Sequence, residues 1–338
     1  MRDPAFWWSR RGIAAWLLYP IAWIYAAIAD RRMRRSGLQL RIPVICVGNF
    51  TLGGAGKTPT ALALAAMLME TGENPFFLTR GHGGRQAGPL RVDPKIHKSD
   101  DVGDEPLLLA RAAPTIVARD RAAGGRYAEQ LGASIIVMDD GLQNPSLAKT
   151  LSLAVIDARR GIGNGLACPA GPLRASLSAQ LERVDAVIFV GDGRKIPSVV
   201  SNMAMTGKRP LLRARLEPEA ASLKALDRRK VLAFAGIGDP EKFFMMLAGA
   251  GIEATIEQSF ADHHRYTRAE AEALLASCDQ KNLVPVTTEK DLVRLQGGDH
   301  VLAALAARSR AIPVTLVFED QKAVKGLLKD AAAKRRPG

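Results

Sequence analysis

The glycine-rich segment at residues 51–58 has the residue types and spacing that most clearly suit chemistry. An apolar run, Ile42 to Val47, precedes it, and a helix-like run, Thr60 to Glu70, follows it. Glycines let backbone N–H groups close around phosphates, a lysine at the exit can reach the β- and γ-phosphates, and the next threonine hydroxyl can bind Mg²⁺. We therefore expect this segment to bind a nucleoside triphosphate. Its residues are Thr51, Leu52, Gly53, Gly54, Ala55, Gly56, Lys57 and Thr58.

The match to a phosphate-binding loop is imperfect at its first position. A strict loop of this kind begins with glycine, and Thr51 stands there. The alternative is a flexible glycine-rich turn between a strand and a helix. Phosphate binding is the favoured interpretation, because Gly-Lys-Thr falls where the helix N-terminus adds its partial positive charge.

Two adjacent carboxylates follow another short apolar run. The run Ile135–Met138 resembles a buried parallel strand and leads into Asp139 and Asp140. Ligands bind at the carboxyl ends of such strands, where a carboxylate can hold Mg²⁺ directly or through water. We expect Thr58 and these two acids, together with Glu105, to hold the metal. An ordinary solvated turn is the alternative for the two acids.

Three polar positions in loops could serve phosphoryl transfer to a hydroxyl. Asp104 could be the base or simply the N-cap of a following helix. His263 follows Asp262, which could fix its tautomer, but a surface histidine pair is equally compatible with the sequence. Arg174 could bind a phosphate through its planar guanidinium or be a solvated loop side chain. Spacing alone leaves these alternatives open.

The composition excludes several classes of protein. The chain has 338 residues, which is enough for two domains, and 47% are hydrophobic, so we expect a sizeable core. The formal net charge of +13 favours an anionic partner. Only 5% of residues are aromatic and no nucleic-acid-binding motif is present, so we expect no nucleic acid. The three cysteines are far apart, which is typical of a reducing cytoplasm.

The N-terminal segment has the composition of a membrane-associated helix. The run from Ile13 to Ala29 carries no charge, arginines flank it, and all four tryptophans of the chain lie in or beside it. Tryptophan favours the headgroup region, and the run would span about 26 Å as a helix, slightly less than a bilayer core. Pro20 interrupts it. We expect a helix in the cytoplasmic leaflet; a signal peptide, a single span and a buried core helix are the alternatives.

Strand-like and helix-like runs alternate along the rest of the chain. This alternation predicts an α/β fold with a mostly parallel, doubly wound sheet of the P-loop NTPase kind, plus a second, smaller α/β domain. We expect a membrane helix in residues 1–36, a first domain in 37–207, a connector in 208–226 and the smaller domain in 227–338. The strand-like runs are Val44–Val47, Phe76–Leu78, Thr115–Val117, Ile135–Met138, Leu153–Ile156, Ala186–Val190, Val231–Ala235, Ile252–Ile256, Leu283–Val286 and Pro313–Val317.

Eight motifs in this order resemble one family, the tetraacyldisaccharide 4'-kinases of lipid A biosynthesis. Each motif is weak alone, but the series extends from the N-terminal helix to near the C-terminus. The motifs are Val47-Gly48-Asn49 with Gly53 to Pro59, Thr79 to Gly83, Val102 to Pro106, Asp139 to Gln143, Gly171 to Arg174, Phe234 to Gly238, Asp262 to His264 and Thr287 to Asp291.

The resemblance implies ATP, Mg²⁺ and phosphorylation of the 4'-hydroxyl of a tetraacylated glucosamine disaccharide 1-phosphate, at the cytoplasmic face of the inner membrane. It implies that Asp104 is the catalytic base, with His263 as its partner and Lys57 on the nucleotide. It also implies that the substrate is bound by Arg174, Arg80 and Gln143. We expect a monomer that associates with inner-membrane lipids as a monotopic or peripheral protein.

Two departures from the family pattern concern details of the site. The family usually has an aromatic residue where His82 stands, and an acid where Ala175 stands. A membrane-associated P-loop ATPase that acts as a switch or positioning protein is the alternative function. Its loop has a second lysine where this chain has Leu52. A GTPase would need a guanine motif in which lysine stands one place earlier than Lys290.

Overall fold

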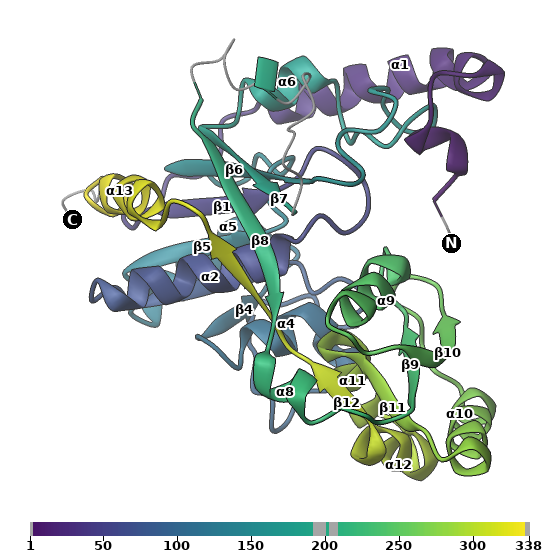
Figure 1. Ribbon diagram of the computed structural model, residues 1–338. Helices are drawn as coiled ribbons and strands as arrows, with labels where there is room; N and C mark the ends of the chain where they lie inside the picture. Colours follow the sequence, from purple (N-terminus) through teal and green to yellow (C-terminus); the bar gives the residue numbers. More distant parts are fainter. Residues whose placement is uncertain (1–2, 192–200, 203–208, 335–338) are drawn as a thin grey trace.

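The structure is a computed structural model that describes residues 3–191, 201–202 and 209–334. It contains two sheets, each flanked by helices, and the larger one carries the glycine-rich loop (Figure 1). The expected domain boundary at residues 207 and 208 lies outside the described residues.

The larger sheet has nine strands and confirms the expected doubly wound α/β class. Its central strands pair in parallel, while β3 and β13 at the two edges run antiparallel to their neighbours. The strands, in sheet order, are β13 (Val314–Phe318), β8 (Leu211–Pro218), β7 (Ala186–Val190), β6 (Leu151–Asp157), β1 (Val44–Gly48), β5 (Ile135–Asp139), β2 (Pro75–Thr79), β4 (Thr115–Val117) and β3 (Leu90–Arg91).

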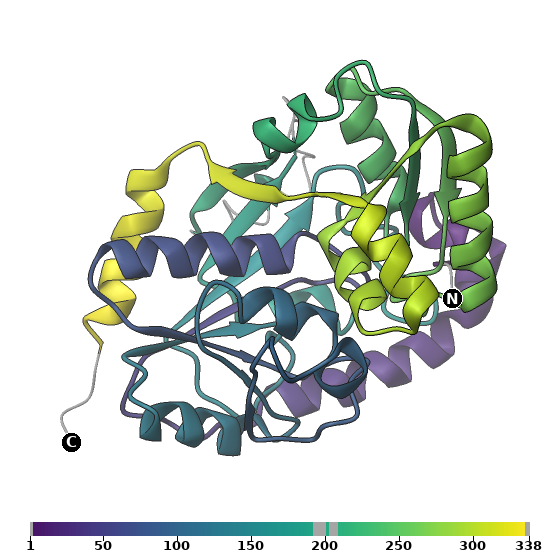
Figure 2. The ribbon, with the colours of Figure 1, turned by 90° about the horizontal axis from the view of Figure 1, so that it is seen from below.

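Helices cover both faces of this sheet, because successive strand residues point to opposite sides. Ile45 and Val47 belong to a core cluster with α2 (Lys57–Glu70) and α13 (Gln321–Ala332), which cover one face (Figure 2). Val44 and Cys46 instead belong to the cluster on the opposite face. The remaining helices of this unit are α3 (Ser99–Val102), α4 (Asp104–Leu109), α5 (Arg121–Gln130) and α6 (Leu177–Leu181).

The smaller sheet has four parallel strands in the order β10-β9-β11-β12. Val231, Ala233 and Ala235 of β9 face α9, whereas Leu232 and Phe234 face α10 and α12, so this sheet is also covered on both sides. Its elements are β9 (Val231–Ala235), α9 (Pro240–Gly249), β10 (Ala254–Ser259), α10 (Arg268–Lys281), β11 (Val284–Thr288), α11 (Glu289–Gln296), α12 (His300–Arg308) and β12 (Arg310–Ile312).

Two strands differ from the expected division of the chain. Residues 211–218 form β8 rather than a connector, and β13 belongs to the larger sheet rather than to the smaller domain. The physical reason is burial. Leu316 and Phe318 of β13 enter the core beneath the larger sheet, and α13 packs beside α2 on the same face. The chain therefore crosses to the smaller unit through β8 and α8 (Ala220–Lys224) and returns through β13.

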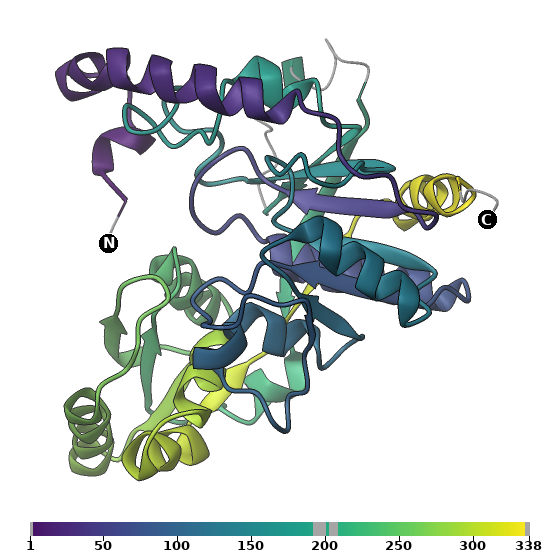
Figure 3. The ribbon, with the colours of Figure 1, turned by 180° about the vertical axis from the view of Figure 1, so that it is seen from behind.

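The N-terminal helix α1 (Ile13–Met33) lies along the outside of the larger unit (Figure 3). Only 11% of its most apolar window is buried, which excludes a core helix. Pro20 lies inside the helix, so the expected interruption there is wrong. Ala15 and Ala22 of α1 are buried against Leu166 and Ala170. A short 3-10 helix, Ala5–Trp8, precedes it.

The loop after β2 packs closely on the segment that leads into α4. Backbone N–H groups of Arg85 and Gln86 donate to the carbonyls of Asp100 and Asp101 at 3.0 and 2.9 Å. Gly103 has φ +91°, and a Cβ there would lie 2.3 Å from the carbonyl oxygen of His82. Only glycine fits this position without strain, so Gly103 permits the close approach of the two segments.

Replacing Gly103 by alanine should lower the free energy of unfolding by about 2 kcal/mol or more, since a side chain is both strained at this φ and blocked by His82. Urea unfolding followed by circular dichroism would measure the change. Gly326→Ala is the matched control, because this glycine lies inside α13 with open space around it. It should leave stability unchanged or raise it by roughly 0.5–1 kcal/mol. Equal stability of both variants would contradict the packing described for Gly103.

Candidate active site

The glycine-rich loop connects β1 to α2, as the sequence predicts. Gly56 has φ +85°, a left-handed conformation that favours glycine, and it forms the N-cap of α2 without any side-chain cap. The first N–H groups of α2 are therefore available to an anion. The Lys57 ammonium, largely buried, donates to the Asn49 side-chain oxygen at 3.4 Å and to the Gly53 carbonyl at 3.3 Å.

Asp139 ends β5 beside the first turn of α2. Its Oδ2 accepts a hydrogen bond from the Thr58 hydroxyl at 3.3 Å, while its buried Oδ1 has no partner. Burial, followed by the nearby charges of Glu105 and Asp140, raises the pKa of Asp139 to about 7. A cation beside Asp139 would relieve this excess of negative charge.

The unpartnered carboxylate oxygen and the adjacent Thr58 hydroxyl fit Mg²⁺, which usually takes one or two protein ligands together with phosphate oxygens and water. Within the described residues there is no group of three histidine, cysteine or acidic side chains that could hold a metal alone. The other two residues that we expect at the metal already have protein partners. Asp140 pairs with Arg174, and Glu105 pairs with Lys290.

Asp140 differs from its neighbour Asp139 in its environment. It has φ +53°, which turns it away from the strand, and it lies 2.8 Å from Arg174 and 3.8 Å from Lys57. Burial would raise the pKa of Asp140, but these two cations lower it to about 2. Arg174 also donates to the carbonyl of Thr51, so it contacts the glycine-rich loop as well as the carboxylate.

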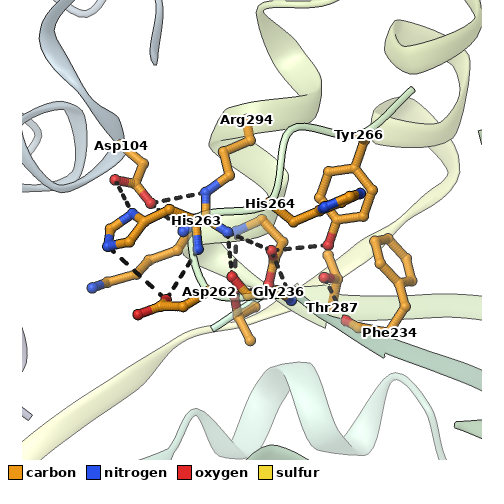
Figure 4. A network of polar contacts seen from close by, with 12 residues as sticks. Asp104, Phe234, Gly236, Asp262, His263, His264, Tyr266, Thr287 and Arg294 are labelled. Atoms are coloured by element: carbon orange, nitrogen blue, oxygen red, sulfur yellow. Dashed lines mark hydrogen bonds and ion pairs between the residues drawn. The ribbon is translucent and has the colours of Figure 1, made fainter. Parts of the chain in front are cut away.

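Asp104 and His263 meet although they come from different units. The Asp104 Oδ1 lies 3.3 Å from the His263 Nδ1, and its Oδ2 accepts two hydrogen bonds from Arg294 (Figure 4). Burial would raise the pKa of Asp104, but the hydrogen bond from His263 and the charge of Arg294 hold it well below its usual value. The hydrogen bond to Asp104 in turn raises the pKa of His263.

The exposure of this pair is unequal. The Asp104 side chain is 4% exposed, whereas that of His263 is 29% exposed.

His263 has φ +54°, and its backbone N–H donates to the Gly236 carbonyl at 3.1 Å. A Cβ on Gly238, two residues further along that loop, would lie 3.2 Å from the backbone nitrogen of Gly54. The loop that supports His263 therefore also contacts the glycine-rich loop.

A buried network around Arg294 supports the pair and was not predicted. Arg294 also donates to the Gly236 carbonyl at 2.6 Å and to Asp291 at 2.8 Å. Asp291 is fully buried and accepts further bonds from Tyr266 and Thr288. The available signal was the spacing of Asp291 and Arg294, which places both on one face of α11.

Two further expected substrate residues, Gln143 and Arg80, follow the carboxyl ends of the interior strands β5 and β2 but differ in their contacts. Gln143 donates to the Asn49 carbonyl at 2.8 Å and to Gln180 at 2.7 Å, so it stabilises the segment that leads into the glycine-rich loop. Arg80 is exposed directly after β2. A buried arginine missed in the sequence, Arg121, lies near Arg80, and its Nε has no partner. Its position at the start of α5 was the only available signal.

Comparison with known proteins assigns the chain to a family. The family described as LpxK, tetraacyldisaccharide-1-P 4'-kinase, matches residues 14–333. The tetraacyldisaccharide 4'-kinase of Nitrobacter winogradskyi is 50% identical over 99% of both chains, and that of Bradyrhizobium diazoefficiens is 49% identical over 99% of this chain and 98% of its own.

The fold agrees with a solved structure over nearly its whole length. The crystal structure of apo-form LpxK from Aquifex aeolicus in complex with ATP aligns with a TM-score of 0.73 and 25% identity. The alignment covers 94% of this chain and 99% of that one. With the matches in sequence, this agreement shows that the chain belongs to the tetraacyldisaccharide-1-P 4'-kinase family.

Proposed function

We propose that the protein transfers the γ-phosphate of ATP to the 4'-hydroxyl of a tetraacylated glucosamine disaccharide 1-phosphate. The single observation that carries the proposal is that Lys57, Thr58 and Asp139 gather at the uncapped start of α2. The loop at residues 236–238, whose Gly236 carbonyl accepts the His263 backbone N–H, lies against the same glycine-rich loop. All these side chains come from one chain, so a single copy suffices.

The chain's own groups can bind and orient the triphosphate. The free N–H groups of α2 and the Lys57 ammonium bind phosphate oxygens, and Thr58 with Asp139 would hold Mg²⁺. When bound, Mg²⁺ neutralises negative charge on the phosphates. Asp140 keeps Lys57 and Arg174 beside the loop through its two ion pairs. Positioning and charge neutralisation supply most of the catalysis in transfers of this kind.

The geometry favours His263 as the proton acceptor, with Asp104 as the residue that orients it. Both oxygens of Asp104 are already bonded, one to His263 and the other to Arg294. The Nδ1–H of His263 faces Asp104, which leaves Nε2 free to accept the proton of the sugar hydroxyl. The hydroxyl oxygen then bonds to the γ-phosphorus while the bond to ADP breaks. This division of roles differs from the expectation that Asp104 is itself the base.

Replacing Lys57 by alanine should lower phosphoryl transfer by at least about 10²–10³-fold, since the charge that stabilises the transferring phosphate is lost. Transfer of labelled γ-phosphate to the acylated disaccharide in mixed micelles would measure it, with the exposed Lys322→Ala on α13 as control. ATP hydrolysis by the wild type without labelled lipid would instead support the membrane-switch ATPase. Near-normal transfer by the Lys57 variant would exclude the proposed nucleotide site.

The pH dependence of kcat should separate the roles of the two dyad residues. If neutral His263 accepts the proton, kcat falls as the pH drops through the pKa of His263. Asp104 raises that pKa, so Asp104→Asn should move the acid limb to lower pH and reduce the plateau by about 10²-fold or more. If Asp104→Asn lost the acid limb of the kcat profile entirely, while His263→Ala remained active, the base would be Asp104 and not His263.

We also propose that α1 anchors the enzyme at the cytoplasmic face of the inner membrane, as a monotopic helix. Large apolar side chains cover its outer surface, including Trp16, Leu17, Trp23 and Ile24, all more than half exposed. The helix would measure about 32 Å. Arginines stand in its last turn at positions 31 and 32 and directly after it at positions 34 and 35, where they can meet anionic headgroups. The anchor would keep the active site beside a substrate whose acyl chains remain in the bilayer.

The double variant Leu17→Asp/Ile24→Asp should weaken binding to anionic phospholipid vesicles, because two charges would enter the apolar surface of α1. These side chains are 74% and 55% exposed, so the fold should survive. Flotation of vesicles would measure bound protein, and ATP affinity should be unchanged. Met245→Asp, at an exposed apolar side chain on α9, is the matched control. Equal flotation of both variants and the wild type would contradict the anchor.

A further inference from the structure

His82 lies against the residue that accepts the proton in the proposed reaction. The imidazole rings of His82 and His263 meet edge to face, with ring centroids 5.0 Å apart and planes inclined by 64°. His82 belongs to the exposed loop after β2, whereas His263 belongs to the smaller unit. The contact therefore joins the two units directly beside the Asp104–His263 pair.

Two carboxylates compete for the His263 ring. Asp104 lies 3.3 Å from Nδ1, and Asp262 lies 3.9 Å from Nε2 on the opposite side. Rotation of the ring by half a turn about its Cβ–Cγ bond would turn Cδ2 instead of Nδ1 toward Asp104, and the contact that fixes the proton on Nδ1 would be lost. A flat ring packed edge-on against one side of the imidazole opposes this rotation, because aromatic pairs have preferred geometries.

Close packing of the backbone fixes the position of His82, so that its ring can oppose rotation of the His263 ring. Gly81 has φ +71°, and a Cβ there would lie 2.9 Å from the Val102 carbonyl oxygen. A Cβ on Gly84 would lie 2.5 Å from the carbonyl carbon of the same valine. The loop that carries His82 is thus pressed from both sides of the residue onto the segment that leads into Asp104. The backbone segment that leads into Asp104 therefore supports both the His82 ring and the Asp104 carboxylate.

We propose that His82 is a positioning residue, which fixes the His263 ring so that Nδ1 faces Asp104 and Nε2 faces the acceptor hydroxyl. This inference rests on the proposed function. His82 acts through the flat shape of its ring and transfers no proton. An aromatic ring without ring nitrogens should therefore replace it, whereas a side chain without a ring should not.

The variants His82→Ala and His82→Phe test this inference in the full chain in detergent micelles. His82→Ala should lower kcat for phosphate transfer roughly tenfold while KM for ATP stays unchanged, because only the orientation of the base is lost. His82→Phe should retain kcat within about twofold of the wild type. His300→Ala, at the start of α12, is the matched control.

Nitrogen NMR of labelled histidine supplies a readout that a loss of folding would not reproduce. The chain contains five histidines, and the signals missing from His263→Ala identify those of His263. The wild type and His82→Phe should show a single tautomer with the proton on Nδ1, and His82→Ala should show a mixture. An unchanged tautomer with unchanged kcat in His82→Ala would overturn the proposal, as would equal losses in the alanine and phenylalanine variants.

The two proposals fail in different ways. A wild-type protein that labels no lipid would refute the proposed kinase function, but the NMR spectra would still show whether His82 orients His263. Normal lipid labelling with an unaltered tautomer in His82→Ala would refute only the role of His82.

Discussion

Two ion pairs, one buried and one partly exposed, join α4 to α11, and the rest of the active site depends on them. Arg294 binds Asp104, and Lys290 donates to Glu105 at 2.6 Å. An isolated charge on Asp104 or Arg294 would be very unfavourable in this buried environment, so each of these two residues is stable there only beside its partner. The apolar contact of Val293 with the Val102 region adds to the junction. Together these contacts fix the smaller unit where His263 meets Asp104 and the loop at residues 236–238 meets the glycine-rich loop.

Much of the larger sheet and the nucleotide site could be predicted, because both depend on local patterns. The apolar runs specify strands, and the glycine-rich loop and Asp139 stand where those strands end. The placement of β8 and β13 could not be predicted, since nothing local distinguishes a strand that returns to a distant sheet. Glu105 illustrates the same limit, because its partner Lys290 stands 185 positions away. A carboxylate expected at the metal proves to be half of an ion pair.

The contrast between Asp139 and Asp140 shows how backbone direction sets the chemistry of identical side chains. Asp139 completes the strand, where burial and then the neighbouring carboxylates raise its pKa, whereas Asp140 turns out through a positive φ and meets two cations. One residue is thereby left in need of a cation, and the other organises the cations already present. Neither outcome follows from the sequence, since both depend on which way the chain leaves β5.

The attachment of α1 to the loop at residues 159–176 has a consequence for how the enzyme meets its substrate. Trp7 donates to the Pro169 carbonyl at 2.9 Å, and the Ser176 backbone N–H donates to Asp30 at 3.0 Å. Arg174 lies in the loop between these contacts, beside Asp140. With α1 anchored as we propose, these contacts would hold the site at a fixed height above the lipid surface. An enzyme held this way searches in two dimensions, so its rate should follow the number of acceptor lipids per unit area of membrane rather than their concentration in the bulk volume.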